Sequence, residues 1–411
     1  MPCTRLPRAG NAVLTILILI AISTSVRAQT YKVLHQFNPN NGDGYFPQSE
    51  IIFDHQGNLY GTTGDGGLET CGQGCGTAWQ LTPNPDGSWT ENLIHKFNGS
   101  DGGFPAGFPV FDTQGNLYGI AGDRGSYGLG GIFKLTPGGG MWTESTLHQF
   151  TGGWDGAGNP GSALSIDNGG HIYGSTAQGG AYGKGVVFAL VGPNSSEVVL
   201  HAFTGGADGG FPLGPLSFDA SGNIYGTAAD GGSGYGLVFK LAPNPSKAGW
   251  TETVIYAFAY QDPIQPNGGV IVDAAGNLYG ATAYGGARGD GAVYKLTHHA
   301  DDSWSPSLLY SFTGPPDGYN AYTPLTFDSA GNLYGTTTLG GPLLGGTVFK
   351  LTPGSGGQWT ETILYGFSGG ADGGQPLYGV ILDRAGNLYG TTPLGGLVPR
   401  GYGGVVFEIT P

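Results

Sequence analysis

The sequence is poor in charge, and most of the charge that it has is negative. Charged residues make up 11% of the 411 positions, and 29 aspartates and glutamates face 15 lysines and arginines. Such an acidic surface repels phosphate backbones, which argues against nucleic acid as a partner. Three of the basic residues, Arg5, Arg8 and Arg27, lie in the first 28 positions, which contain no acidic residue.

Long hydrophobic runs are missing beyond the N-terminus. Residues 12–22 form a short apolar stretch behind Arg5 and Arg8, and Val26-Arg27-Ala28 supplies small side chains where a signal peptidase cuts. The stretch is shorter than the about 20 residues that a membrane-spanning helix needs. We therefore expect residues 1–28 to be a secretory signal peptide, the remainder to be secreted or periplasmic, and no membrane span to be left after its removal. The alternative is an N-terminal anchor that is retained.

Cysteine is also scarce. Cys3 lies in the expected signal, which leaves Cys71 and Cys75, separated by Gly-Gln-Gly. A zinc site needs more ligands than this pair, and no histidine or cysteine cluster stands nearby in the sequence. In an exported protein this spacing predicts a small loop-closing disulfide, whereas a redox-active pair more often has two intervening residues.

Glycine is abundant instead, with 83 residues, and aromatic residues make up 12% of the chain. Each glycine inside a helix costs roughly 1 kcal/mol relative to alanine, so long helices are disfavoured. The chain is too apolar and aromatic for disorder and lacks the glycine-every-third pattern of collagen. An all-β repeat protein remains.

One unit occurs seven times. Its most regular block is Gly-Asn-Leu/Ile-Tyr-Gly, in which only the third copy departs, with His171 in place of asparagine. The block's tyrosines are Tyr60, Tyr118, Tyr173, Tyr225, Tyr279, Tyr334 and Tyr389. Six residues before each stands an aspartate: Asp54, Asp112, Asp167, Asp219, Asp273, Asp328 and Asp383. With a following Gly-x-Val-Phe-Lys-Leu-Thr-Pro segment and a Trp-Thr-Glu segment, each unit contains four short β-rich runs.

Four antiparallel strands repeated about every 50 residues are typical of a β-propeller blade. The fourth run of the last unit is found at the other end of the chain, in Tyr31–Phe37. We therefore expect residues 29–411 to form a monomeric, seven-bladed β-propeller of four-stranded blades. The N-terminal strand is expected to complete the last blade beside Gly404–Thr410.

Residues present in every copy are expected to build the fold, because a single site needs one of each group. The repeated tyrosines and phenylalanines are therefore interpreted as core between blades. We interpret the histidines and tyrosines of the fourth run in the same way, since they belong to separate blades. These residues are His35, His95, His148, His201, Tyr256, Tyr310 and Tyr365.

The loops after the fourth run carry a repeated aspartate next to glycine. Carboxylates and backbone carbonyls suit calcium, and weak extracellular calcium sites have a dissociation constant of about 10⁻⁴–10⁻³ M. The alternative is that each aspartate only forms its own turn. The candidate metal ligands are Asp43, Asp101, Asp155, Asp208, Asp262, Asp317 and Asp372.

A unique ligand site is expected where one copy departs from the pattern. Glu50 stands where other copies have small or apolar residues, Arg124 replaces a repeated glycine, and Trp154 is a loop tryptophan able to stack on a sugar. The other departures are Asn159, Arg288, Asp290 and Arg400. Known catalytic motifs, such as Gly-x-Ser-x-Gly, His-Glu-x-x-His or a Walker loop, are missing.

The block Gly-Asn-Leu-Tyr-Gly-Thr-Thr and the later Gly-Thr-Val-Phe-Lys-Leu-Thr-Pro, best seen in Gly331–Pro353, resemble the GloVer tandem-repeat proteins. The resemblance covers residues 31–411 and implies an exported bacterial protein. The Asp-x-x-Gly-Asn-Leu-Tyr block is distantly similar to NHL-type and gluconolactonase-like propellers. The lactonases hold a divalent metal at the channel mouth, and the resemblance implies that Glu50 is comparable with one of its ligands.

Two functions follow from these observations. The first is a non-catalytic binding or structural module with an extracellular glycan or protein as its ligand. The alternative is a metal-dependent hydrolase or lyase of the gluconolactonase-like type. Whether the chain is an enzyme stays open at this point.

Overall fold

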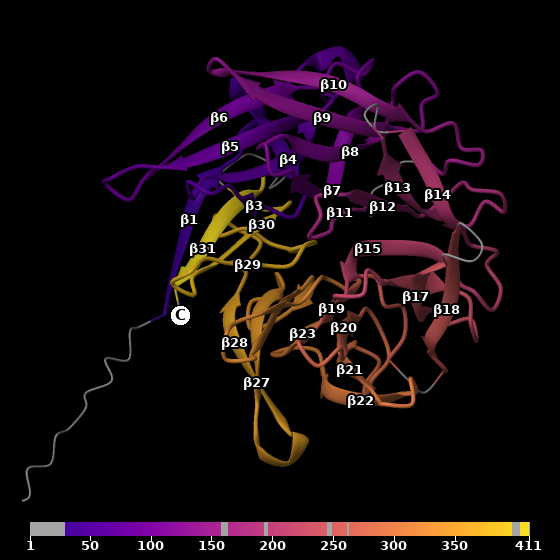
Figure 1. Ribbon diagram of the computed structural model, residues 1–411. Coiled ribbons are helices and arrows are strands. Elements are labelled where there is room, and N and C mark those ends of the chain that lie inside the picture. Colours follow the sequence, from indigo (N-terminus) through magenta and orange to yellow (C-terminus); the bar gives the residue numbers. More distant parts are fainter. Residues whose placement is uncertain are drawn as a thin grey trace, which may run out of the picture.

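The computed structural model describes residues 29–157, 163–192, 196–244, 249–260, 263–396 and 403–410. These residues form strands β1 to β31 and three short 3-10 helices, with no α-helix among them. The sheets are arranged around a common centre in a propeller-like manner (Figure 1). The expected signal peptide lies outside the described residues, and in the part that is described no helix is long and apolar enough to cross a membrane.

Within the sequence repeats, the longer strands pair antiparallel with their neighbours in chain order. Repeat one contains β2 (Gly44–Pro47), β3 (Ile52–Phe53), β4 (Leu59–Gly66), β5 (Thr77–Pro83) and β6 (Trp89–Lys96). Repeat two contains β7 (Gly103–Phe111), β8 (Leu117–Asp123), β9 (Gly131–Gly138) and β10 (Met141–Gln149). Repeat three contains β11 (Ala163–Ile166), β12 (Ile172–Thr176), β13 (Val186–Val191) and β14 (Ser196–Ala202). Repeat four contains β15 (Gly210–Phe218), β16 (Ile224–Asp230), β17 (Leu237–Asn244) and β18 (Gly249–Ala257).

The later repeats follow the same order with shorter first strands. Repeat five contains β19 (Val270–Val272), β20 (Leu278–Thr282), β21 (Ala292–His298) and β22 (Trp304–Ser311). Repeat six contains β23 (Gly318–Tyr319), β24 (Thr326–Phe327), β25 (Leu333–Thr337), β26 (Leu339–Gly340), β27 (Thr347–Pro353) and β28 (Trp359–Gly366). Repeat seven contains β29 (Ile381–Leu382), β30 (Leu388–Thr392) and β31 (Val405–Thr410). The 3-10 helices are η1 (Pro39–Asn41), η2 (Glu69–Cys71) and η3 (Ser355–Gly357).

The expectation of seven separate four-stranded sheets is corrected. The strands of repeat one form a five-stranded sheet, and those of repeat six divide into a four-stranded and a two-stranded sheet. Repeats two and three share one eight-stranded sheet. The two halves are joined by a parallel pair between Ala163 of β11 and Phe108 of β7. At this junction Ala163 and Phe108 are buried in one cluster with Tyr378.

The strand at the N-terminus pairs with the strand at the C-terminus. β1 (Thr30–Gln36) lies antiparallel to β31, with Val33 opposite Phe407 and Gln36 opposite Val405, in the sheet order β1-β31-β30-β29. Figure 1 shows the indigo β1 beside the yellow β31. The ring of Tyr31 also stacks on that of Tyr365, at 3.8 Å between centroids, which ties β1 to repeat six.

The repeated aspartate, asparagine and tyrosine form one hydrogen-bonded turn. In repeat four, Asp219 accepts bonds from the backbone N–H groups of Ser221 and Asn223, from Asn223 Nδ2 and from the Tyr225 hydroxyl. The tyrosine ring is buried while its hydroxyl reaches this carboxylate. This network explains why the three residue types recur together at fixed spacing.

Two repeated glycines are required by close packing. A Cβ on Gly226, which follows the tyrosine, would lie 2.5 Å from Cζ of Phe239 on the paired strand β17. A Cβ on Gly236, at φ +89°, would lie 2.7 Å from Cδ of Pro266 in the next repeat. The first glycine makes room within a sheet, and the second makes room between neighbouring sheets.

The core is a series of aromatic contacts between successive repeats. Trp79 and Phe133 lie on third strands, and Phe97 and Phe150 follow fourth strands; all are at most 1% exposed. Phe97 packs edge-on against Phe133 of the next repeat, with ring centroids 5.0 Å apart, and Phe150 does the same with Phe188 at 6.0 Å. Each repeat therefore completes the core of its neighbour, as expected for stacked units that cannot bury their faces alone.

Candidate functional site

First-strand segments from six repeats converge on a central pocket of about 310 Å³. Its size lies at the lower end of the about 300–1,000 Å³ that is usual for small-ligand sites. The lining is neutral and combines aromatic, aliphatic, amide and glycine residues. It consists of Gln48, Phe108, Leu213, Gly214, Asn267, Gly268, Tyr322, Pro324, Leu377 and Tyr378.

A repeated backbone kink leads into these segments. Six residues that precede a proline or an alanine have positive φ values between 52° and 61°: Phe46, Phe104, Phe211, Gln265, Asn320 and Gln375. Such a conformation is costly for residues with a side chain, so the surroundings must hold it in place. The backbone N–H of each donates to a carbonyl in a loop of the neighbouring repeat, as Gln265 does to Tyr235 at 3.0 Å. The residues that line the pocket follow two to four positions later.

Two amide side chains in the pocket have an acceptor without a donor. Oε1 of Gln48 and Oδ1 of Asn267 are buried, and neither has a hydrogen-bond partner. Buried polar atoms are almost always paired, and an amide oxygen accepts from N–H or O–H groups. The pocket therefore presents two acceptors to a ligand that carries donors.

Aromatic side chains form another part of the wall. The ring of Tyr378 packs edge-on against Phe108, 5.5 Å away, and the Gly107 N–H donates to its hydroxyl at 3.2 Å. Burial raises the pKa of Tyr378, so it remains a neutral phenol. Tyr322 is only partly buried and is the more accessible of the two tyrosines.

Glu50 lies beside this pocket. Its N–H donates to the carbonyl of Gly107 at 2.9 Å, and its Oε1 is 3.6 Å from the point where a Cβ on Gly379 would stand. Burial raises the pKa of Glu50 to about 7. This carboxyl group is therefore able to exchange a proton near neutral pH.

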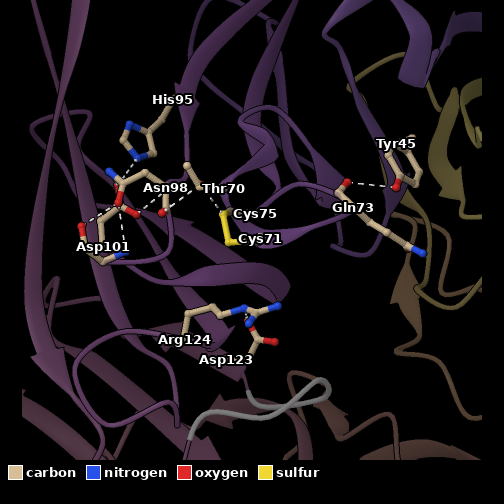
Figure 2. The surroundings of a disulfide bond; sticks show 11 residues. Tyr45, Thr70, Cys71, Gln73, Cys75, His95, Asn98, Asp101, Asp123 and Arg124 are labelled. Carbon is tan, nitrogen blue, oxygen red and sulfur yellow. Dashed lines mark hydrogen bonds and ion pairs between the residues drawn. A yellow bond between two sulfur atoms is a disulfide. The ribbon is translucent and has the colours of Figure 1, made fainter.

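The other candidate ligand residues are not brought together with Glu50. Trp154 is 78% exposed on its loop. Arg124 has a positive φ of 67°, and its Nε lies 3.6 Å from Oδ1 of the adjacent Asp123 (Figure 2). Arg288 is exposed, and no ion pair joins it to Asp290 among the described residues. Asn159 and Arg400 lie outside the described part of the chain.

The loop aspartates lie next to the fourth strands, at the outer side of the sheets. Each accepts a bond from the backbone N–H that follows the last phenylalanine of the preceding strand, as Asp101 does from Asn98 at 2.9 Å. The other members that behave in this way are Asp43, Asp155, Asp208, Asp317 and Asp372. Asp262 is outside the described residues. These carboxylates belong to separate loops rather than to one ring around the centre.

Cys71 and Cys75 form the expected disulfide, with their Cα atoms 5.1 Å apart. Figure 2 shows it beside Thr70, whose hydroxyl donates to the carbonyl of Asn98 in the following loop at 3.0 Å. The disulfide therefore closes the loop after β4, and the Thr70–Asn98 hydrogen bond holds that loop against the connection that follows β6.

Sequence reasoning missed the pocket amides and tyrosines. These residues stand two or three positions after the repeated positive-φ residue, where repeat four has the aliphatic Leu213 and Gly214. They are Gln48, Asn267, Tyr322 and Tyr378. A comparison of the repeats at these positions would have shown them as departures from the pattern, which is the criterion that selected Glu50.

A second hollow, of about 540 Å³, lies between the first turns of repeats one and two. It is larger than the central pocket, but its acidic residues Asp54 and Asp112 already accept the bonds of their own turns. The same turn chemistry recurs around the molecule, which makes this hollow a product of the repeat.

The arrangement of the sheets is similar to those of solved structures. A proposed 6-phosphogluconolactonase from Bacteroides uniformis is 14% identical over 84% of this chain and 90% of that protein, with a TM-score of 0.55. A luciferin-regenerating enzyme is 13% identical over 93% of this chain and 96% of that protein, with a TM-score of 0.42. At this identity the first likeness shows the fold alone.

The sequence comparisons are more specific. No curated protein matches the sequence. The model of the Gloeobacter/Verrucomicrobia repeat matches residues 69–251 and 233–411, in agreement with the expected resemblance. The chain therefore belongs to the Gloeobacter/Verrucomicrobia repeat family.

Proposed function

We propose that this exported chain is a closed ring of seven blades that binds a small glycan, one or two sugar residues in size, in its central pocket. The observation that carries the proposal is the pair of unpartnered acceptors, Gln48 Oε1 and Asn267 Oδ1, in a neutral pocket with aromatic walls. Sugar hydroxyls are the matching donors. The apolar face of a sugar ring matches the side chains of Tyr322 and Phe108.

The closure of the ring is part of this proposal, because the pocket is made by segments from across the chain. It is supported by the pairing of β1 with β31 and by the stacking of Tyr31 on Tyr365. Similar hydrogen bonds between neighbouring loops recur from repeat to repeat, and Phe46 N–H donates to Gly403 at the junction of repeats seven and one.

The test is a titration of the full chain with neutral and acidic mono- and disaccharides, followed by saturation-transfer NMR or calorimetry. Asn267→Leu and Gln48→Leu keep the side-chain size and remove the acceptor. A lost hydrogen bond of about 0.5–1.5 kcal/mol predicts binding that is roughly 2- to 10-fold weaker for each variant.

Asn92→Leu is the matched control, since this amide is exposed on β6 and is not among the residues that line the central pocket. It is expected to bind like the wild type. Saccharide binding that is unchanged in both leucine variants, or absent in the wild type at millimolar concentration, contradicts the proposal.

Glu50 favours a second candidate, a hydrolase or lyase acting on a lactone or sugar. A carboxyl group whose pKa is about 7 is suited to general acid–base catalysis at neutral pH. Glu50→Gln then abolishes turnover of the substrate while binding persists. Because the described lining of the pocket contains no aspartate, glutamate or histidine, a metal-dependent version would have Glu50, beside the pocket, as its one carboxylate ligand.

A further inference from the structure

The fourth strands form a repeated contact across the boundary between neighbouring repeats. The histidine or tyrosine of one fourth strand meets the aspartate of the loop that follows it. The fourth strand of the next repeat supplies a glutamate to the same place in several copies. Each such group combines a histidine or tyrosine and an aspartate from one repeat with a glutamate from the next. It is therefore different from a site made by the four histidines together, which belong to separate repeats.

In one copy the three side chains come within metal-binding distance of one another. Nε2 of His148, on β10, lies 3.1 Å from Oδ2 of Asp155 and 3.8 Å from Oε2 of Glu197, on β14. One donor atom from each residue lies within 4.8 Å of the other two. In a tetrahedral zinc site with bonds of about 2.0–2.2 Å, neighbouring ligand atoms stand about 3.3–3.6 Å apart, so small side-chain movements are sufficient.

Glu197 has a buried carboxyl group that is not fully hydrogen-bonded in the described structure. Its side chain is only 6% exposed, and its Oε1 is buried without a hydrogen-bond partner. Oδ2 of Asp155 and Oε2 of Glu197 both lie within 3.8 Å of Nε2 of His148. A cation between the two carboxylates would relieve both the repulsion and the missing partner.

We propose that His148, Asp155 and Glu197 bind a divalent transition-metal ion such as Zn²⁺, which bridges repeats two and three. One imidazole and two carboxylates are suitable ligands for zinc, whereas calcium prefers six to eight oxygen atoms. The fourth tetrahedral position is left to water. This site is separate from the central pocket and does not depend on the proposed function.

A second copy of the set stands where the two ends of the chain meet. Nε2 of His35, on β1, lies 3.1 Å from Oδ2 of Asp43 and 3.8 Å from Oε1 of Glu91, on β6. These atoms satisfy the same 4.8 Å limit. An ion there would connect the N-terminal strand to repeat one and thereby strengthen the junction between the two ends.

The experiment measures bound zinc in the purified full chain. The protein is stripped with a chelator, equilibrated with micromolar Zn²⁺ and analysed by mass spectrometry of the metal. His148→Tyr is the informative variant, because Tyr310 and Tyr365 occupy the same position in other repeats and donate to Asp317 and Asp372. We expect H148Y to bind one zinc fewer than the wild type, and the double variant H35Y/H148Y to bind two fewer.

Tyr310→His is the converse variant. It places a histidine beside Asp317 and Glu361, whose Oε1 is also buried without a partner, so one additional zinc is expected. His171→Gln is the control, since His171 is exposed and pairs with Asp167 without belonging to either three-residue set. A wild-type chain that binds no zinc, or a zinc content unchanged in H35Y/H148Y, overturns the proposal.

Discussion

A single carboxylate organises the first turn of each repeat. Asp219 accepts four hydrogen bonds within a stretch of seven residues, and the Tyr225 hydroxyl is one of the donors. Burial alone would raise the pKa of Asp219, but the bonds from Asn223 and Tyr225 outweigh it and the pKa is lowered. The stability that this turn provides is therefore present above the ordinary pKa of an aspartate and is lost as the pH falls through the lowered value.

The first prediction removes this carboxylate. Asp219→Ala leaves four donors without an acceptor and is expected to lower the free energy of unfolding by about 2–3 kcal/mol at pH 7. Urea denaturation measures it. Ser221→Ala, in the same turn, removes an exposed hydroxyl and should leave the midpoint unchanged; an equal loss in both variants would contradict the assigned role.

The glutamates of the fourth strands have the opposite dependence on pH. Burial, and then the charge of Asp208, raise the pKa of Glu252 to about 7, and burial and Asp317 do the same for Glu361. The folded chain holds these protons between the ordinary pKa near 4.5 and about 7, so its stability falls as the pH rises through that range.

The second prediction follows from that sign. The double variant Glu252→Gln and Glu361→Gln has neutral side chains of the same shape at every pH. In chelator-treated protein it should match the wild type near pH 4 and exceed it at pH 8, measured as the urea midpoint at each pH. A wild type whose stability rises from pH 5 to pH 8 as much as that of the variant would contradict it.

The strands and turns were predictable because their determinants repeat. The aspartate, the tyrosine and the glycine recur at fixed offsets, so seven copies gave the same signal for strand order and for the buried aromatic residues. Gln48 and Asn267 were not predicted from the sequence. Their importance depends on side-chain oxygens that are buried without a hydrogen-bond partner, and residue spacing does not reveal hydrogen-bond partners. The proposed metal ligands were not predicted as a group, because His148 and Glu197 belong to different repeats and lie far apart in the sequence.

The third prediction concerns the contact between adjacent sheets. Gly236 lies against Pro266 of the next repeat and the Ala228 carbonyl, each 2.7 Å from a Cβ placed on it. Gly234, in the same loop, has a nearly equal φ of +91°, but nothing lies within 4 Å of its Cβ position. Gly236→Ala should destabilise the chain by several kcal/mol, and Gly234→Ala by the backbone cost alone, roughly 1–2 kcal/mol. Thermal unfolding of the two variants compares them, and equal losses would remove the packing argument.

At the scale of the molecule, neighbouring repeats share their aromatic core. The Phe97–Phe133 contact and its equivalents connect repeats in series, and Tyr31 supplies an aromatic contact to repeat six. Without β1, the outer edge of β31 would expose its hydrogen-bonding groups, which is the usual route by which sheets associate. The N-terminal strand is therefore expected to control both cooperativity and solubility.

The last prediction tests that dependence directly. The test compares a chain that lacks residues 1–37 with one that lacks only residues 1–28. The shorter chain should unfold at a lower urea concentration. It should also associate as its concentration rises, as measured by light scattering after gel filtration. Loss of the whole β1–β31 ladder, rather than of one side chain, is the physical cause. Adding a synthetic peptide of residues 29–37 should restore the monomer, because it supplies the same backbone partners, whereas a scrambled peptide should not. If the truncated chain stays monomeric with an unchanged midpoint, then the two ends do not hold the ring together.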